Sequence, residues 1–185
     1  PRQQPAECQL EQAAISPDGR KVAFAARGEI FAASAKDGGD AARVTRTTAR
    51  EQQIEWTSDS RQIVYVSSRA GYAQLFIYDF TTRTETALTN DPRGDLNPRV
   101  SPDGRSVAFA RGGRELAVVD VATKRVRTLA SGLFDRLPFT SDLGIAWSPD
   151  NRWVAYTAAD GGMFNTVFVG PAAGGQARAI SFLPN

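Results

Sequence analysis

Four segments of the chain share one arrangement of apolar and polar positions. Each has an apolar or aromatic residue, a polar turn centred on an aspartate, an arginine two residues later, and a short apolar run that ends in Phe or Tyr. The segments read AISPDGRKVAF, EWTSDSRQIVY, RVSPDGRSVAF and AWSPDNRWVAY, starting at Ala14, Glu55, Arg99 and Ala146. Their aspartates recur after 41, 44 and 47 residues. A period of about 40–45 residues made of short strands is typical of the blades of a β-propeller.

The third repeat shows how one blade is built. The turn SPDG combines a Pro that presets φ, an Asp that bonds its own backbone and a Gly that tolerates positive φ. Alternating apolar residues on either side predict strands. We expect strands at Asn97–Val100, Val107–Arg111, Glu115–Asp120 and Arg125–Leu129.

The other repeats follow the same order, so the predicted fold class is all-β. We expect one β-propeller segment over residues 1–185 with four four-stranded blades and an N-terminal extension at residues 1–12. The expected blades cover about residues 13–48, 53–90, 96–130 and 144–182.

The repeated aspartates allow two interpretations. They could form a ring of metal ligands or catalytic acids, but a turn role is favoured because such a carboxylate satisfies backbone N–H groups locally. The four residues are Asp18, Asp59, Asp103 and Asp150. Trp56 and Trp147, which precede two of the turns, are expected in the core rather than on a ligand platform.

Composition excludes several kinds of chemistry. The chain has no histidine, which removes the commonest general base and transition-metal ligand, and its single cysteine, Cys8, cannot form an intrachain disulfide. We therefore predict no catalytic residue, no metal and no cofactor. The 22 basic residues nearly balance 20 acidic ones and form no stripe, which argues against a nucleic-acid partner. No window is apolar enough for membrane insertion.

The repeat carries a family resemblance. The unit SPDGRKVAF followed by a short hydrophobic strand resembles the propeller repeats of tricorn-type proteases, TolB and the prolyl-oligopeptidase group. RGEIFAASAKDGGDAARVT (Arg27–Thr45) and PAAGGQARAISFLPN, at the end of the chain, look like blades of bacterial tricorn protease homologues. The resemblance implies a propeller that filters or channels peptides, with the catalytic serine and histidine in a separate region.

Three functions follow as hypotheses. The first is a non-catalytic scaffold and peptide-gating module of a tricorn-like serine peptidase. The second is a TolB-like periplasmic interaction propeller, and the third is the lid propeller of a prolyl-oligopeptidase-like hydrolase. A periplasmic or secreted location is slightly favoured over a cytoplasmic one.

Four blades of this repeat predict part of a larger ring, because the related families use six or seven. Open blade flanks need covering, so we expect the remaining blades and the catalytic domain of the parent protein as partners, or self-association. A closed four-bladed monomer is the alternative.

A long link, Ser131–Gly144, carries Phe134, Arg136, Leu137 and Phe139 and allows two interpretations. The favoured one is that its apolar residues fold back and plug the mouth of the propeller channel, and the other is that these four residues are a candidate contact for a peptide or protein ligand. Asp91, Asp95 and Asn97 form an acidic cluster, but its spacing lacks the oxygen ladder of a calcium loop.

Overall fold

The computed structural model describes residues 10–132, 134, 144–159 and 165–180, and in these residues every regular element is a β-strand. The strands form four separate sheets of four, each an antiparallel meander in chain order. Blade 1 consists of β1 Leu10–Ile15, β2 Lys21–Ala26, β3 Glu29–Ser34 and β4 Ala42–Arg43. Blade 2 consists of β5 Glu51–Trp56, β6 Gln62–Ser67, β7 Gln74–Asp79 and β8 Thr84–Ala87. Blade 3 consists of β9 Asp95–Val100, β10 Ser106–Arg111, β11 Glu115–Asp120 and β12 Val126–Ser131, and blade 4 of β13 Ala146–Trp147, β14 Trp153–Ala159, β15 Asn165–Pro171 and β16 Arg178–Ala179.

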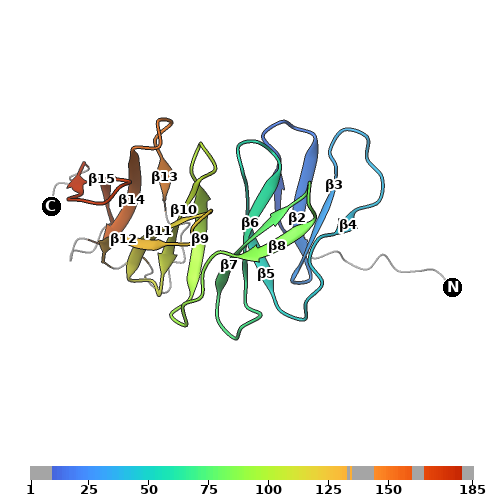
Figure 1. Cartoon of the computed structure of the whole chain (residues 1–185), viewed down its shortest axis with the longest axis horizontal. Helices are drawn as coiled ribbons and strands as arrows, with labels where there is room; N and C mark the ends of the chain where they lie inside the picture. Colours follow the sequence, from blue (N-terminus) through green and yellow to red (C-terminus); the bar gives the residue numbers. More distant parts are fainter. Residues whose placement is uncertain (1–9, 133, 135–143, 160–164, 181–185) are drawn as a thin grey trace.

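The four blades stand side by side in chain order, with blades 1 and 4 at opposite ends of an open row (Figure 1). The predicted all-β class and the four four-stranded blades of a partial propeller are confirmed. The first strands β1, β5, β9 and β13 are neighbours from blade to blade, as the innermost strands of a propeller are. We call the surface that these four strands form the inner wall.

The first strand begins at Leu10, within the stretch that the sequence assigned to an N-terminal extension. Leu10 and Gln12 pair with Ala26 and Ala25 across a register shift, a β-bulge that breaks the alternation on which the prediction relied. The fourth strands vary in length: β4 and β16 have two residues each, β8 has four and β12 has six.

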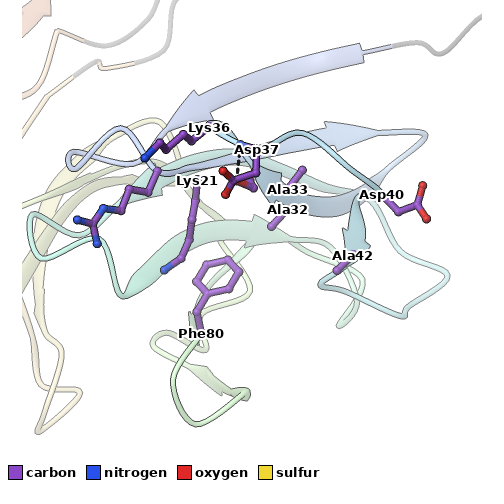
Figure 2. Close-up of a pocket in the computed structure, with 10 residues that line it drawn as sticks. Lys21, Ala32, Ala33, Lys36, Asp37, Asp40, Ala42 and Phe80 are labelled. Carbon is purple, nitrogen blue, oxygen red and sulfur yellow. Dashed lines mark hydrogen bonds between the residues drawn. The ribbon is translucent and has the colours of Figure 1, made fainter.

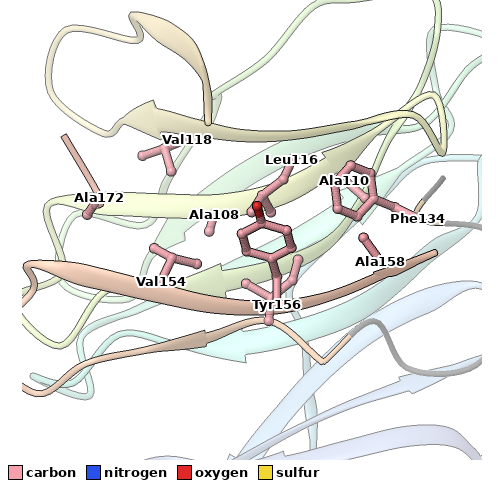
Figure 3. Close-up of a cluster of buried hydrophobic side chains, with 10 residues drawn as sticks. Ala108, Ala110, Leu116, Val118, Phe134, Val154, Tyr156, Ala158 and Ala172 are labelled. Carbon is pink, nitrogen blue, oxygen red and sulfur yellow. The ribbon is translucent and has the colours of Figure 1, made fainter. Parts of the chain in front are cut away.

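The core lies between the blades rather than inside a single sheet. Three clusters of buried residues fill the spaces between blades 1 and 2, 2 and 3, and 3 and 4. Figure 3 shows the last of these, where Ala108, Leu116 and Val118 of blade 3 face Val154 and Tyr156 of blade 4. Full burial of a Val or Leu side chain such as Val118 or Leu116 stabilises the fold by roughly 1.5–3 kcal/mol.

The two predicted core tryptophans also connect neighbouring blades by hydrogen bonds. Trp56 is buried, and its Nε1 donates to the Ala14 carbonyl of blade 1 at 2.9 Å. Trp147 is half-buried against the cluster between blades 3 and 4, and its Nε1 donates to the Arg99 carbonyl of blade 3 at 2.9 Å. Both rings therefore fix the position of one inner strand against the preceding one.

Candidate functional site on the inner wall

The four repeated aspartates lie in the turns between the first and second strands of the blades. In every blade the carboxylate accepts a hydrogen bond from the hydroxyl two residues earlier and from the backbone N–H two residues later, at 2.5–3.1 Å. The hydrogen bond from Ser16 is the main cause that lowers the pKa of Asp18, and the one from Ser148 does the same for Asp150. Carboxylates held ionised within their own turns make poor acid–base catalysts near neutral pH.

These turns also bond to one another. The residue after the aspartate has positive φ in all four blades: it is Gly in blades 1 and 3, Ser60 in blade 2 and Asn151 in blade 4. Ser60 Oγ accepts from the Asp18 N–H, and Asn151 Oδ1 accepts from the Asp103 N–H, each at 3.0 Å. The two polar replacements for glycine thus link neighbouring blades.

In blades 1, 2 and 3 an amide side chain lies on the inner wall six residues before the repeated aspartate, whereas blade 4 has Gly144 at that position. The Gln12 side-chain amide bonds both the N–H and the carbonyl of Ile54, at 2.9 and 3.3 Å. The Gln53 amide donates to Asn97 Oδ1 at 2.9 Å and accepts from the Asn97 N–H at 2.7 Å. Gln53 and Asn97 have φ of 57° and 55° beside bulges in β5 and β9, where the strand backbone is free of regular pairing.

A small recess opens between blades 2, 3 and 4 at the inner wall. Its volume is about 250 Å³, and Glu55, Arg99 and Trp147 line it. Glu55 Oε2 and Arg99 Nη1 are 3.6 Å apart, an ion pair that is too long for a direct hydrogen bond. Their side chains are 32% and 35% exposed, so both charges are partly open to solvent.

The charges in the recess are held in place by different partners. Arg99 Nη1 donates to the Pro98 carbonyl at 3.2 Å. Burial raises the pKa of Glu55, against the lowering effects of the Arg99 charge and of a hydrogen bond from the Val100 backbone. The recess therefore combines a carboxylate, a guanidinium and an indole ring, which together suit a polar peptide group or one side chain.

Glu55 and Arg99 are not among the site residues predicted from the sequence. Both occupy the position four residues before the repeated aspartate, where blades 1 and 4 have Ala14 and Ala146. A charged residue that replaces alanine at one position of a repeat was the available signal. The sequence does not show that these two residues meet, because Glu55 and Arg99 belong to different blades.

The predicted partner-contact residues have different outcomes. Phe134 is buried, its backbone N–H donates to the Gly113 carbonyl at 2.8 Å, and its ring lies 5.8 Å from that of Tyr156 (Figure 3). It packs between blades 3 and 4, and only 6% of the residue is exposed, which leaves little surface for a partner. Arg136, Leu137 and Phe139 lie outside the described residues, and their contact with a partner stays a prediction.

The acidic cluster is paired with arginines. Asp95 is fully buried and accepts two hydrogen bonds from Arg111, at 2.7 and 3.0 Å. Arg93 bonds Asp91 and is the main cause that holds the pKa of that carboxyl well below its usual range. Asn97 instead belongs to the inner wall, so the three residues do not converge on one point.

Two further findings concern the described residues alone. No three carboxylates or cysteines among them come together as metal ligands. None of their elements is a helix of a length and hydropathy that could cross a membrane.

The family model for PD40, TolB beta propeller domain, matches residues 7–145, three of the four blades and their links. The chain belongs to the TolB β-propeller family. Three of the four repeated turns, those of Asp18, Asp59 and Asp103, lie within the matched residues.

Similar proteins include both peptidases and TolB itself. Dipeptidyl-peptidase 5 of Porphyromonas gingivalis is 30% identical over 124 residues, which cover 58% of this chain and 17% of that protein. The crystal structure of the tricorn protease superposes with a TM-score of 0.73 at 16% identity, over 97% of this chain and 18% of that one. TolB from Acinetobacter baumannii has a TM-score of 0.68 at 22% identity, over 91% of this chain and 45% of that one. The chain therefore spans less than half the length of each of these proteins.

Proposed function

We propose that this TolB-family chain is the non-catalytic propeller segment of a tricorn-like serine peptidase, where it acts as a scaffold and guides peptides along its inner wall. The recess at Glu55 and Arg99 is the observation that carries the proposal. The peptidases among its relatives support it, as does the absence of histidine from all 185 residues, which leaves the general base to another part of the parent protein.

The geometry of the recess suits transient contact better than tight binding. Ligand pockets for small molecules usually enclose about 300–1,000 Å³, and this recess is smaller. The Glu55–Arg99 pair at 3.6 Å leaves donor and acceptor capacity for passing peptide groups. Weak contacts of the peptide with the Glu55 carboxylate and the Arg99 guanidinium would let it move along the inner wall without being held tightly.

The test is a binding titration of the 185-residue chain with a fluorescein-labelled unstructured peptide, followed by anisotropy. Arg99→Ala should weaken the apparent affinity at least tenfold, because a charged hydrogen bond contributes about 1.5–3 kcal/mol. Arg125→Ala, in the exposed turn between β11 and β12, removes the same charge away from the wall and should change binding less than twofold. Equal losses in both variants, or no binding at all, would refute the proposal.

The main alternative is a TolB-like interaction propeller, which the family match also supports. If a folded envelope protein binds in an Arg99-dependent manner and the unstructured peptide does not, this alternative takes the place of peptide guiding. In either case we propose a periplasmic or secreted location. Fractionation of cells that express the parent protein tests the location directly.

The partners proposed for the outer blades are the remaining blades and the catalytic domain of the parent. Alternation along β2 places Phe24 on the face of blade 1 that points away from blade 2, where it stacks on Phe31 at 5.7 Å. On blade 4, Trp153 is 43% exposed. These flanks also make self-association an expected behaviour of the isolated chain. A well-behaved monomer of 20.0 kDa at high concentration, measured by light scattering, would contradict it.

A further inference from the structure

A second cavity lies away from the inner wall, between the outer part of blade 1 and the end of β7 in blade 2. Its volume is about 640 Å³, within the range of small-molecule and peptide pockets. Lys21 and Phe80 face each other across its lower part, and Ala32, Ala33 and Ala42 supply apolar lining (Figure 2).

Cationic groups gather at one end of this cavity. Arg20, Lys21 and Lys36 all line it, and Lys21 and Lys36 are two of only three lysines in the chain. The Arg20 and Lys36 side chains are exposed and come from neighbouring turns of blade 1. Three positive groups at one end of an apolar hollow create an attractive potential for an anion.

Lys21 is held in position by groups from blade 2. Its Nζ donates to the Ser60 carbonyl at 3.2 Å and lies 5.3 Å from the centre of the Phe80 ring. Phe80 is itself fixed, because it stacks on Trp56 at 5.1 Å and meets the edge of Tyr78 at 5.1 Å. The ammonium group is thus preorganised at the cavity and retains N–H groups that can donate to a ligand.

Two carboxylates lie near these three basic groups, Asp37 in the cavity lining and Asp18 beside Arg20 and Lys21, and they reduce the positive charge of this end without cancelling it. Asp37 is engaged in its own turn, where Oδ2 accepts from Ser34 Oγ at 3.1 Å. Asp40 lies at the opposite end of the cavity (Figure 2). Gly38 and Gly39, both with positive φ, set the path of the loop that separates the two aspartates.

We propose that this cavity binds a peptide carboxylate, with the anion at Arg20, Lys21 and Lys36 and the adjoining aliphatic groups on Phe80 and the alanines. The carboxylate can come from the C-terminus of a peptide or from an acidic side chain, which offer the same chemistry. The cavity and the wall recess have no lining residue in common. They are linked only through Trp56, which lines the recess and stacks on Phe80 of the cavity. This site therefore stands or falls independently of peptide guiding at Arg99.

The experiment measures binding of three fluorescein-labelled tetrapeptides to the 185-residue chain by anisotropy. One ends in leucine with a free carboxylate, the second is its C-terminal amide, and the third is an amide that carries a glutamate side chain. The free acid should bind saturably, and the amide at least tenfold more weakly. Binding by the glutamate peptide as well would support the site and show that either source of carboxylate suffices.

Lys21→Met keeps the aliphatic stem on Phe80 and removes the charge, so the affinity for the free acid should fall at least tenfold. Lys124→Met is the matched control, because Lys124 is the one remaining lysine and lies in the exposed turn between β11 and β12. Its affinity should stay within twofold. Lys36→Met, on an exposed turn, gives a second variant if loss of the Ser60 contact disturbs folding, and it should weaken binding at least threefold. Equal affinity for acid and amide, or equal losses in Lys21→Met and Lys124→Met, would overturn the proposal.

Discussion

The buried ion pair of blade 3 offers the sharpest test of how this fold is stabilised. Asp95 and Arg111 face each other in the register of β9 and β10, and Asp95 is fully buried. The Arg111 side chain is 10% exposed, and its other acidic contact is Asp91, at 3.3 Å from Nη1. Asp95→Ala would therefore leave a largely desolvated guanidinium with one partner in place of two.

Removing one member of a buried pair costs about 3–5 kcal/mol, because the other charge stays buried without compensation. Asp91 remains within reach of Arg111, so we expect a loss near the lower end, about 3 kcal/mol. A domain has a total stability of only about 5–15 kcal/mol, which makes this a large fraction. With a urea m-value of about 2 kcal/mol/M, the unfolding midpoint should fall by about 1.5 M.

The assay is urea unfolding followed by tryptophan fluorescence and far-UV circular dichroism. Asp40→Ala, in an exposed loop, removes the same charge and should change stability by less than about 0.5 kcal/mol. The double variant Asp95→Ala with Arg111→Ala should lose less than the sum of the two single losses, since neither charge is then left unpaired. Additive losses, or an Asp95→Ala midpoint equal to that of Asp40→Ala, would refute the assignment.

Three further predictions concern the blade contacts, the turns and the recess. Trp56→Phe removes the hydrogen bond to the Ala14 carbonyl and should lower the free energy of unfolding by about 1 kcal/mol in urea titrations. Gly104→Val should lower the free energy of unfolding by roughly 1–2 kcal/mol, because φ at this residue is 71°. Gly104→Asn should be nearly neutral in thermal melts, because Asn151 adopts a φ of 62° at the same repeat position. Burial raises the folded-state pKa of Glu55 above its usual 4.5, so folding takes up a proton at pH values just above 4.5. The stability of the wild type relative to Glu55→Gln, measured by urea unfolding at a series of pH values, should therefore decline as the pH rises through and above 4.5.

Each of these predictions has a matched comparison. Trp153→Phe changes an exposed indole and should leave stability within about 0.5 kcal/mol of the wild type. Equal losses for Gly104→Asn and Gly104→Val would contradict the argument from positive φ, because the added Cβ meets no atom within 4 Å. A difference between wild type and Glu55→Gln that does not vary with pH would contradict the effect of burial on that carboxyl.

Local chemistry explains what could be predicted from the sequence by itself. In each turn the hydroxyl, the aspartate and the backbone N–H groups that follow bond to one another within six residues, and the alternating positions beside them favour strands. Blade number, strand order and the turn position of Asp18 and its three equivalents are therefore contained in short stretches of the chain. The bulged start of β1 at Leu10 was not, because its pairing depends on the partner strand.

Only the tertiary structure decided which polar groups meet between blades. Glu55 and Arg99 are 44 positions apart, and Lys21 reaches Phe80 across 59, yet both contacts depend on how neighbouring sheets are stacked and twisted. Phe134, read from the sequence as a partner contact, is buried because the space between blades 3 and 4 accepts its ring. The repeat thus specifies the blades one at a time, while the packing between them creates the recess, the cavity and the surfaces that a ligand would meet.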